Sequence, residues 1–329
     1  MKFNYLQWLL LGAVTSSAHA QVSEFVSTQW QALYEARQYS QLEKQAQTYL
    51  QTHPNDPQGV LALALASGSD AEKGRIVLTQ SQTCMERDPK AALCHFATGM
   101  LMTQQVVNGG PLTAMRYGAA IGKEFEQAVQ LQPTYLPARF ALVQFFLGAP
   151  RIVGGGIDKA RDTEKETPLE QGEYAKILRG QIAISEDEND LAIKEFRSVN
   201  TSGDEQLARR LRLARMDFGQ ALLRDKQYDK AETVFEELNK DFPDRAEGYY
   251  GLGRCALEKN DINGAIRQLE KALSLKGVEL LPVDQRLGEA YAAKGDNQKA
   301  KALLERFLKQ PNMLKSNVDS AKKLLAQLS

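Results

Sequence analysis

A repeated arrangement of glycine, alanine and large apolar residues is the sequence feature that most limits how this chain can fold. Gly219, Gly253 and Gly288 lie 34 and 35 residues apart, and each directly follows a large apolar residue. An alanine comes twelve residues after each glycine, and a large apolar residue comes four residues later. These residues are Ala231, Ala265 and Ala300, followed by Phe235, Leu269 and Leu304. A period of this length indicates structural repeats that bury their apolar faces by stacking on their neighbours.

The spacing within each repeat predicts two antiparallel helices. Small residues allow two helices to cross closely, and the large residue fills the space beside the crossing. Pro243 and Pro311 end two of the units, while Asn260-Asp261 and Gly295-Asp296 are typical of the turn between the two helices. No alternating pattern is long enough to indicate a strand. The same helical spacing occurs once more upstream, in Gly180, Ala192, Phe196 and Val199.

This pattern resembles that of the tetratricopeptide repeat (TPR) family, whose period is 34 residues. The match is closest over Met216–Pro243 and Tyr249–Ala272, and nearly as close over Leu287–Phe307. The resemblance implies an all-α, right-handed superhelical solenoid of antiparallel helix hairpins. Such arrays need a solvating cap on the last repeat, and the amphipathic segment Asn317–Leu328 suits that role.

The N-terminal half departs from the pattern at two insertions. About ten extra residues, around 106–111, separate the two helices of the unit that begins at Ala91, and a second insertion covers 149–156. Both contain glycine and proline, so we expect two inserted loops. We expect about eight hairpins in all. The predicted divisions are 1–20 as signal peptide, 21–135 as divergent repeats, 136–172 as a divergent repeat with the Gly-rich insertion, 173–314 as regular repeats and 315–329 as a capping helix.

Several features of the N-terminal half are also similar to a group of exported bacterial TPR proteins. These features are Cys94-His95 after a proline turn, Arg139-Phe140, Ala149-Pro150, the glycine run 154–156 and Lys159-Ala160. The resemblance supports the fold and an exported location, and it supplies no activity.

The first twenty residues have the three parts of a secretory signal peptide. Lys2 is a basic start, Leu6–Val14 is an apolar run, and Ala18-His19-Ala20 precedes Gln21 as a cleavage site. The alternative is a membrane anchor, but the apolar run is roughly half of the ~20 residues that a spanning helix needs. We therefore expect cleavage before Gln21, a periplasmic location and no membrane insertion after cleavage.

The charge balance excludes a strongly nucleic-acid-binding protein. The chain has 41 basic and 41 acidic residues, so there is no excess positive charge to attract phosphate. The signal peptide contains one charged residue, Lys2, so the mature chain carries a single net negative charge. The overall charge therefore gives no indication of electrostatic capture by anionic lipid.

Two of the three cysteines are placed to form a disulfide bond. Cys84 and Cys94 are ten residues apart across Pro89, where we expect a break between two helices. Export would place them in an oxidising compartment, which favours a bridge over two unpaired buried thiols. Cys255 lies within an apolar helical stripe and is expected to be an inert packing residue.

The sequence gives little indication of catalysis or of a cofactor. After cleavage only His53 and His95 remain, in different units, and no Cys-x-x-Cys or His-x-x-x-His pair is present. A zinc site or a catalytic triad is therefore not indicated. The acidic run 186–190 lacks the glycine turn and distant glutamate of a calcium loop, so we expect a solvated turn there.

The second insertion is the first candidate site. A glycine run before a helix can present backbone amides to an anion; the alternative is a turn that lets the insertion fold back on the array. Because turns between first and second helices share one edge of a solenoid, we expect the two insertions to be neighbours. Insertions of this kind often mark a binding face. The predicted insertion patch comprises Arg116, Arg151, Ile152, Val153, Gly154, Gly155 and Gly156.

The second candidate site is a concave groove lined by first-helix residues that are not needed for packing. Aromatic and arginine side chains are good anchors for a protein partner, although several of these residues could instead pack between neighbouring repeats. In chaperone-binding TPR proteins, lysine and asparagine in the groove clamp a C-terminal carboxylate. The matching positions here hold Met216, Gln220, Tyr250 and Arg254, so that clamp is not expected. The predicted groove comprises Phe145, Tyr174, Gln181, Met216, Gln220, Arg224, Tyr250 and Arg254.

These observations favour a non-catalytic periplasmic scaffold that binds a protein or peptide in its concave groove. One alternative is a small-ligand binder or an enzyme that uses the Gly-rich insertion patch. Another is a structural subunit of a cell-envelope assembly.

Overall fold

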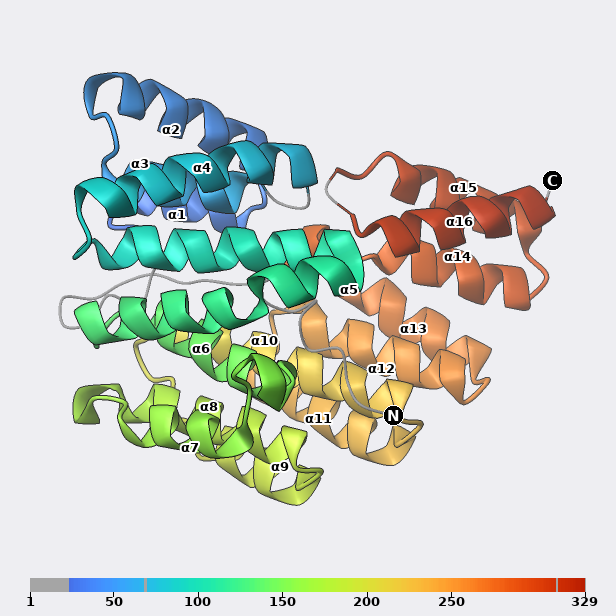
Figure 1. Ribbon diagram of the computed structural model, residues 1–329. Helices are drawn as coiled ribbons and strands as arrows, with labels where there is room; N and C mark the ends of the chain where they lie inside the picture. The colour runs from blue at the N-terminus through green and yellow to red at the C-terminus, as the bar shows by residue number, and fades with distance from the viewer. Residues whose placement is uncertain (1–23, 68–69, 312, 329) are drawn as a thin grey trace. The chain divides into compact units, whose positions relative to one another are not determined.

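The computed structural model describes residues 24–67, 70–311 and 313–328. The predicted signal peptide lies outside these residues. The described residues contain sixteen α-helices and no strand (Figure 1). The predicted all-α solenoid of helix hairpins is confirmed. No helix in the described part of the chain is both long enough and apolar enough to span a bilayer.

The chain divides into two compact units, which meet at Leu211 and Arg212 inside one helix, α10 (Glu205–Arg224). This boundary separates two groups of residues that pack mainly among themselves. The boundaries expected at 135/136 and 172/173 instead separate divergent repeats from regular ones. The latter therefore stay predictions about where regular repeats begin.

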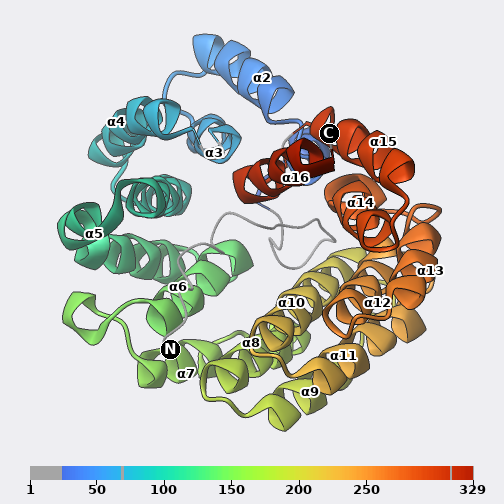
Figure 2. The ribbon, with the colours of Figure 1, turned by 90° about the vertical axis from the view of Figure 1, so that its right-hand side faces the viewer.

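Unit 1 is a stack of helix hairpins. In Figure 2, α3, α6 and α8 lie along the inner side of this stack, and α2, α4, α7 and α9 lie along its outer side. Two 3-10 turns, η2 (Arg151–Val153) and η3 (Leu169–Gln171), lie between helices. The helices are α1 (Thr28–Glu35), α2 (Tyr39–Thr52), α3 (Pro57–Ala66), α4 (Ala71–Arg87), α5 (Ala92–Leu131), α6 (Leu136–Gly148), α7 (Ile157–Lys165), α8 (Gly172–Ser185), α9 (Asn189–Arg197) and the start of α10.

The first insertion is helical, which corrects the expected loop around residues 106–111. The helix α5 is 40 residues long and kinks at Gly110, whose φ of 72° and ψ of −161° are not helical. Pro111 lacks an amide hydrogen and has a helical φ, so it is well suited to start a new helical segment. The chain therefore bends at Gly110 and continues as helix.

The two halves of α5 nevertheless cross at a glycine that faces a large apolar residue, as the repeat pattern predicts. A Cβ added to Gly99 would lie 2.5 Å from the Phe125 ring, and these residues are 26 apart instead of the 16 that separate Gly219 from Phe235. The ten extra residues thus lengthen both helices beyond the crossing and leave the crossing itself intact.

Unit 2 holds the regular repeats. A Cβ on Gly219 would lie 2.4 Å from Phe235, one on Gly253 would lie 2.5 Å from Leu269, and one on Gly288 would lie 2.8 Å from Leu304. Each glycine is therefore the crossing point of one hairpin, as the spacing predicts. Besides the end of α10, the helices are α11 (Tyr228–Asp241), α12 (Ala246–Glu258), α13 (Ile262–Ala272), α14 (Val283–Ala293), α15 (Asn297–Leu308) and α16 (Lys315–Leu328), with a 3-10 turn η4 (Val278–Leu280) before α14.

The last helix, α16, caps this array. Its Ala321 is buried against Leu304 and Phe307 of α15, and Leu324 and Leu325 pack at the edge of the same cluster. The other side of α16 is polar, so the exposed end of the last hairpin is covered by a soluble surface. The predicted capping helix is confirmed.

The predicted disulfide is also confirmed. Cys84 at the end of α4 and Cys94 at the start of α5 are bonded, with their Cα atoms 5.9 Å apart. Cys255 is free and buried. Burial raises the pKa of the Cys255 thiol to about 12, which suits the expected packing role because the reactive thiolate is scarce at neutral pH.

Candidate functional site

The inner face of unit 2 is lined by the first helices of its hairpins, α10, α12 and α14. Gln220 on α10 accepts a hydrogen bond from Nη1 of Arg254 on α12, at 3.4 Å. Tyr250 on α12 forms a side-chain hydrogen bond with Arg286 on α14. Nη1 of Arg286 also lies 2.8 Å from Oε2 of Glu289. We call this series, formed by Gln220, Arg254, Tyr250, Arg286 and Glu289, the inner ladder.

The ladder confirms that Gln220 and Arg254 meet across neighbouring repeats, as the 34-residue spacing implies. Both are partly exposed, and Arg224, one turn further along α10, is exposed. These three polar residues of the predicted groove are therefore within reach of a partner.

The two apolar members of the predicted groove in unit 2 are not exposed. Tyr250 is 3% exposed and Met216 is 5% exposed. The expectation that they are not needed for packing is wrong, because both side chains are buried. Whether either residue contributes to partner binding stays a prediction.

The predicted groove residues of unit 1 are also mainly packing residues. Phe145 is 3% exposed, and its ring faces Gly122 of α5, where a Cβ would lie 2.4 Å away. Tyr174 is 5% exposed and its hydroxyl donates to Oδ2 of Asp204 at 2.9 Å. Gln181 is partly exposed, and its Oε1 has no hydrogen-bond partner among the described residues. Phe145 and Tyr174 thus follow the alternative interpretation, packing between neighbouring elements.

A buried ionic cluster joins the two ends of unit 1, and nothing in the sequence predicted it. Glu24 is 2% exposed; burial raises its pKa to about 7, and the nearby guanidinium groups of Arg210 and Arg209 oppose the rise. Nε2 of Gln31 donates to Glu24 at 3.3 Å. Arg209 of α10 also lies 3.9 Å from Glu35 of α1. The two ends of unit 1 therefore meet through their own side chains.

The second insertion packs on the helical segment that follows the first. Val153 of η2 packs against α5, where a Cβ added to Gly118 would lie 3.0 Å from it. Arg116 and Arg151 are exposed, and Ile152 is 93% exposed. The insertion patch is thus formed by the second half of α5 and by η2.

The glycine run of this patch does not present its amides to a ligand. Within the run 154–156, the three amides donate to backbone oxygens at 3.0, 3.2 and 2.9 Å, those of Arg151, Pro150 and Phe146. The ammonium group of Lys159 in turn donates to the Gly154 oxygen at 3.0 Å. Because the donors that an anion would need are already used, the run acts as the turn that folds the insertion back on α6.

Comparison with protein families decides the kind of repeat. The family model described as tetratricopeptide repeat matches residues 216–277, and a second model with the same description matches residues 285–312. The chain contains tetratricopeptide repeats. Both matches fall in unit 2, where the crossing glycines recur every 34 or 35 residues.

Solved structures similar to this chain include other TPR proteins. The APC/C hetero-tetramer Cut9-Hcn1 matches with 16% identity and a TM-score of 0.45, over 90% of this chain and 55% of that one. A TPR protein from Parabacteroides merdae matches with 14% identity and a TM-score of 0.45, over 88% and 98%. Yeast Tom70 matches with 13% identity and a TM-score of 0.45, over 84% and 64%. The chain thus spans about half of the Cut9-Hcn1 chain. A search of curated proteins found no significant match.

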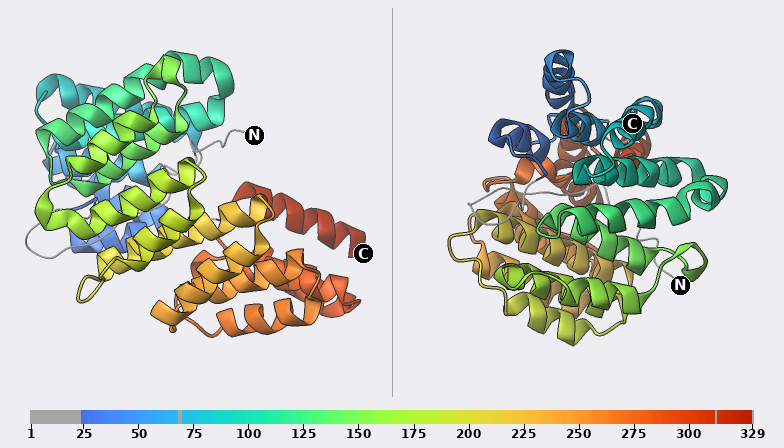
Figure 3. Two further views of the ribbon diagram at one scale, coloured as in Figure 1. Left: turned by 90° about the horizontal axis from the view of Figure 1, so that it is seen from below. Right: turned by 60° about the vertical axis from the view of Figure 1, so that its left-hand side comes forward.

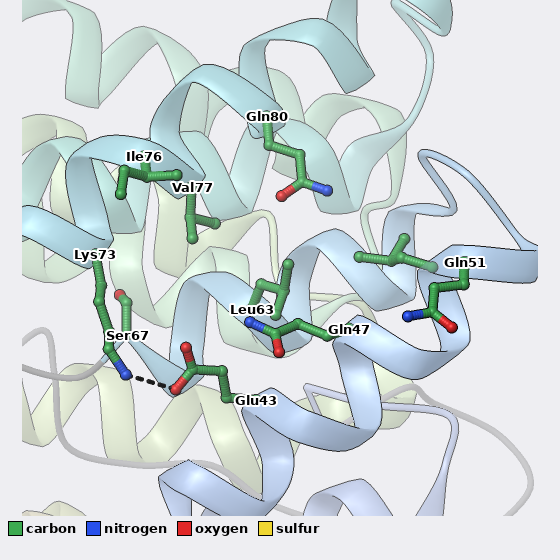
Figure 4. A pocket seen from close by; sticks show the side chains of 10 residues that line it. Glu43, Gln47, Gln51, Leu63, Ser67, Lys73, Ile76, Val77 and Gln80 are labelled. Carbon is green, nitrogen blue, oxygen red and sulfur yellow. Dashed lines mark hydrogen bonds and ion pairs between the residues drawn. The ribbon is translucent and has the colours of Figure 1, made fainter.

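The helix hairpins of unit 1 also form a pocket that the sequence did not predict. It has a volume of about 410 Å³ and lies between α2 and α4 with α3 as its floor (Figure 4). An ion pair between Lys73 and Glu43, with 2.7 Å between Nζ and Oε2, lies at one side. The wall is mixed in character, formed by Gln47, Leu50, Gln51, Leu63, Ser67, Ile76, Val77 and Gln80.

The two histidines and the acidic run 186–190 make structural contacts. Nδ1 of His95 is 2.6 Å from Oε2 of Glu124, and the His53 ring stacks on Tyr49 with 4.2 Å between ring centroids. Glu186, from the acidic run, pairs with Arg161. Across the described ranges, no three His, Cys, Asp or Glu residues are grouped so that they could hold a metal ion.

Proposed function

We propose that this chain is a non-catalytic periplasmic scaffold that binds a protein or peptide along the inner face of unit 2. The observation that carries the proposal is the inner ladder, where Gln220 and Arg254 of successive TPR hairpins are partly exposed side by side. Solenoids use extended inner surfaces of this kind for binding.

The Arg254 side chain can readily exchange its hydrogen bond to Gln220 for one to a bound protein. Its bond to Gln220 is 3.4 Å long, beyond the usual 2.7–3.2 Å range for N–H···O hydrogen bonds, so breaking it costs little. A backbone carbonyl or carboxylate of a bound segment would replace this contact with a shorter, charge-assisted one. Arg224 on the same helix as Gln220 is exposed and adds a second cation to the face.

The periplasmic location rests on the leader sequence and is supported by the disulfide. The signal pattern ends at Ala20, and the Cys84–Cys94 bond is of a kind that persists in oxidising compartments and is rare in the cytosol. The alternative based on the Gly-rich patch has no such support, because the amides of that run are already hydrogen-bonded.

The test is capture of partners from the cell's envelope fraction by crosslinked pull-down with the chain that begins at Gln21. Arg254→Ala should weaken capture of the recovered partner at least about tenfold, which corresponds to about 1.4 kcal/mol. Arg267→Ala is the matched control, because Arg267 is an exposed arginine on α13 of the same hairpin.

Circular dichroism should show unchanged helix content in both variants. Equal capture by Arg254→Ala and Arg267→Ala would reject the inner face of unit 2 as the binding surface. Tyr250→Ala is unsuitable for this test, because a residue that is 3% exposed would be expected to lower stability when truncated.

A further inference from the structure

Three large apolar side chains are exposed together at one edge of unit 1. Leu112 is 82% exposed, Met115 is 78% exposed and Ile152 is 93% exposed. In the right-hand view of Figure 3, the kinked part of α5 and the segment before α7 reach out at the same edge of this unit. Large apolar side chains exposed in a group usually mark an interaction surface, whereas single ones need no explanation.

The packing places these side chains on one continuous surface. Leu112 and Met115 are three residues apart on α5, and Gly118 is three residues further along, so each residue of this series is next to the following one on the helix surface. Val153 packs on Gly118, which sets the neighbouring Ile152 at the end of this series. We call Leu112, Met115, Ile152 and the exposed Arg116 and Arg151 the α5–η2 patch.

The two chain segments that form the α5–η2 patch carry positive charge only. Residues 105–123 and 145–157 contain no aspartate or glutamate. The next acidic residues already have partners: Glu124 is bonded to His95 at 2.6 Å, and Asp158 lies 3.3 Å from Arg161. The chain's balanced total charge does not describe this surface, because charges further away than about 8 Å are largely screened at physiological ionic strength.

We propose that the α5–η2 patch docks the chain on the surface of a membrane that contains anionic lipid. Protruding apolar side chains flanked by arginines match such a surface, where the apolar groups enter the boundary between headgroups and acyl chains. Arg116 and Arg151 would then bind lipid phosphates, to which guanidinium groups donate paired hydrogen bonds. The contact is shallow and reversible. It involves a surface of unit 1, so it is independent of the binding function proposed for unit 2.

Vesicle co-sedimentation tests this docking. The protein used is the chain from Gln21 onward, because the apolar run Leu6–Val14 would itself bind lipid. It should sediment with vesicles that contain phosphatidylglycerol and much less with vesicles of phosphatidylcholine alone. Added salt should release it, since the arginine contribution is screened.

Two sets of substitutions separate the apolar and charged contributions. Leu112→Ser with Met115→Ser and Ile152→Ser should weaken binding to the anionic vesicles at least about tenfold. Arg116→Gln with Arg151→Gln should weaken it and reduce its dependence on salt. The matched control is Leu169→Ser in η3, because Leu169 is 97% exposed outside the patch and should leave binding unchanged.

Three results would overturn the proposal, provided that circular dichroism shows the variants folded. One is the absence of binding to anionic vesicles, and another is an equal loss of binding in Leu169→Ser. The third is a dimer of the wild-type chain that the triple serine variant converts to monomer, which would make the patch an interface between two copies.

Discussion

Glycines at the helix crossings hold the repeats together at the scale of single residues. Gly180 faces the ring of Phe196, and Gly219 faces the ring of Phe235. In each case a Cβ added to the glycine would lie 2.4 Å from the nearest ring atom. Phe235 also contacts Gly251 of the next hairpin, where a Cβ would lie 2.1 Å away. Its ring therefore sits between two glycines and cannot move aside for either.

This arrangement predicts opposite effects for two glycine substitutions. Gly219→Ala should lower the free energy of unfolding by about 1–3 kcal/mol, because the added methyl group overpacks a ring that is fixed on both sides. Gly172→Ala at the start of α8 meets nothing within 4 Å and has a helical φ of −57°, so it should be neutral or stabilise by up to about 1 kcal/mol. Urea unfolding monitored by circular dichroism measures both. Equal effects of the two substitutions would contradict the crossing role of Gly219.

The sequence was a good guide to these crossings and a poor one to side-chain exposure. Spacing located Gly219, and spacing together with the expected oxidising compartment located the Cys84–Cys94 bond, because both depend on short distances along the chain. Tyr250 is buried and forms a hydrogen bond with Arg286, which is 36 residues further along the chain. Contacts between successive repeats decide which first-helix residues remain accessible, and the pattern within one helix does not contain that information.

At the scale of elements, α5 shows how a helix can absorb an insertion. Gly109-Gly110-Pro111 suggested a loop, since each residue type commonly interrupts a helix. In the structure only Gly110 leaves the helical conformation, because a single bend suffices when proline starts the next segment. Local residue preferences could not distinguish one kinked helix from two helices and a loop. The glycine run 154–156 was ambiguous for the same reason, since its hydrogen bonds depend on how the chain turns back on Phe146.

A pair of side chains ties the two halves of α5 together and should make stability depend on pH. The hydrogen bond with Glu124 raises the pKa of His95 above its ordinary value of 6.5, against the opposing effect of burial. A raised folded-state pKa adds stability below the ordinary pKa, and this contribution disappears as the pH rises through the raised value. The stability difference between the wild type and Glu124→Gln should therefore be largest near pH 5.5–6 and shrink toward pH 8.5.

Chemical denaturation across that pH range measures the difference, with His95→Gln as the second variant. Both variants should lose the same pH-dependent part, because either substitution removes the pair. A stability difference that stays constant from pH 5.5 to 8.5 would show that the His95–Glu124 contact does not depend on the charge of the imidazole.

At the scale of the whole molecule, the two units offer different surfaces. The ends of unit 1 are joined by contacts that involve Glu24, Gln31 and Arg209, whereas the inner face of unit 2 presents partly exposed polar side chains. The capping helix followed from the repeat pattern. The contact between the ends of unit 1 could not be predicted in this way, because it joins residues far apart in the sequence, such as Glu35 and Arg209.

The proposed export concerns the whole chain and predicts a defined N-terminus. Protein recovered from the cell envelope should begin at Gln21, since the residues before it form the signal pattern. N-terminal sequencing gives the answer directly. A membrane-bound chain that retains Met1 would mean that the apolar run serves as an anchor.

The central claim is that the inner face of unit 2 binds a protein, and site-specific photo-crosslinking tests it most directly. A photoreactive amino acid in place of Gln220 on α10 lies on the inner ladder, and one in place of Arg267 on α13 serves as the control on the second helix of a hairpin. In intact cells, we expect a discrete crosslinked partner at position 220 and none at position 267. A partner crosslinked at 267 but not at 220 would contradict binding at the inner face.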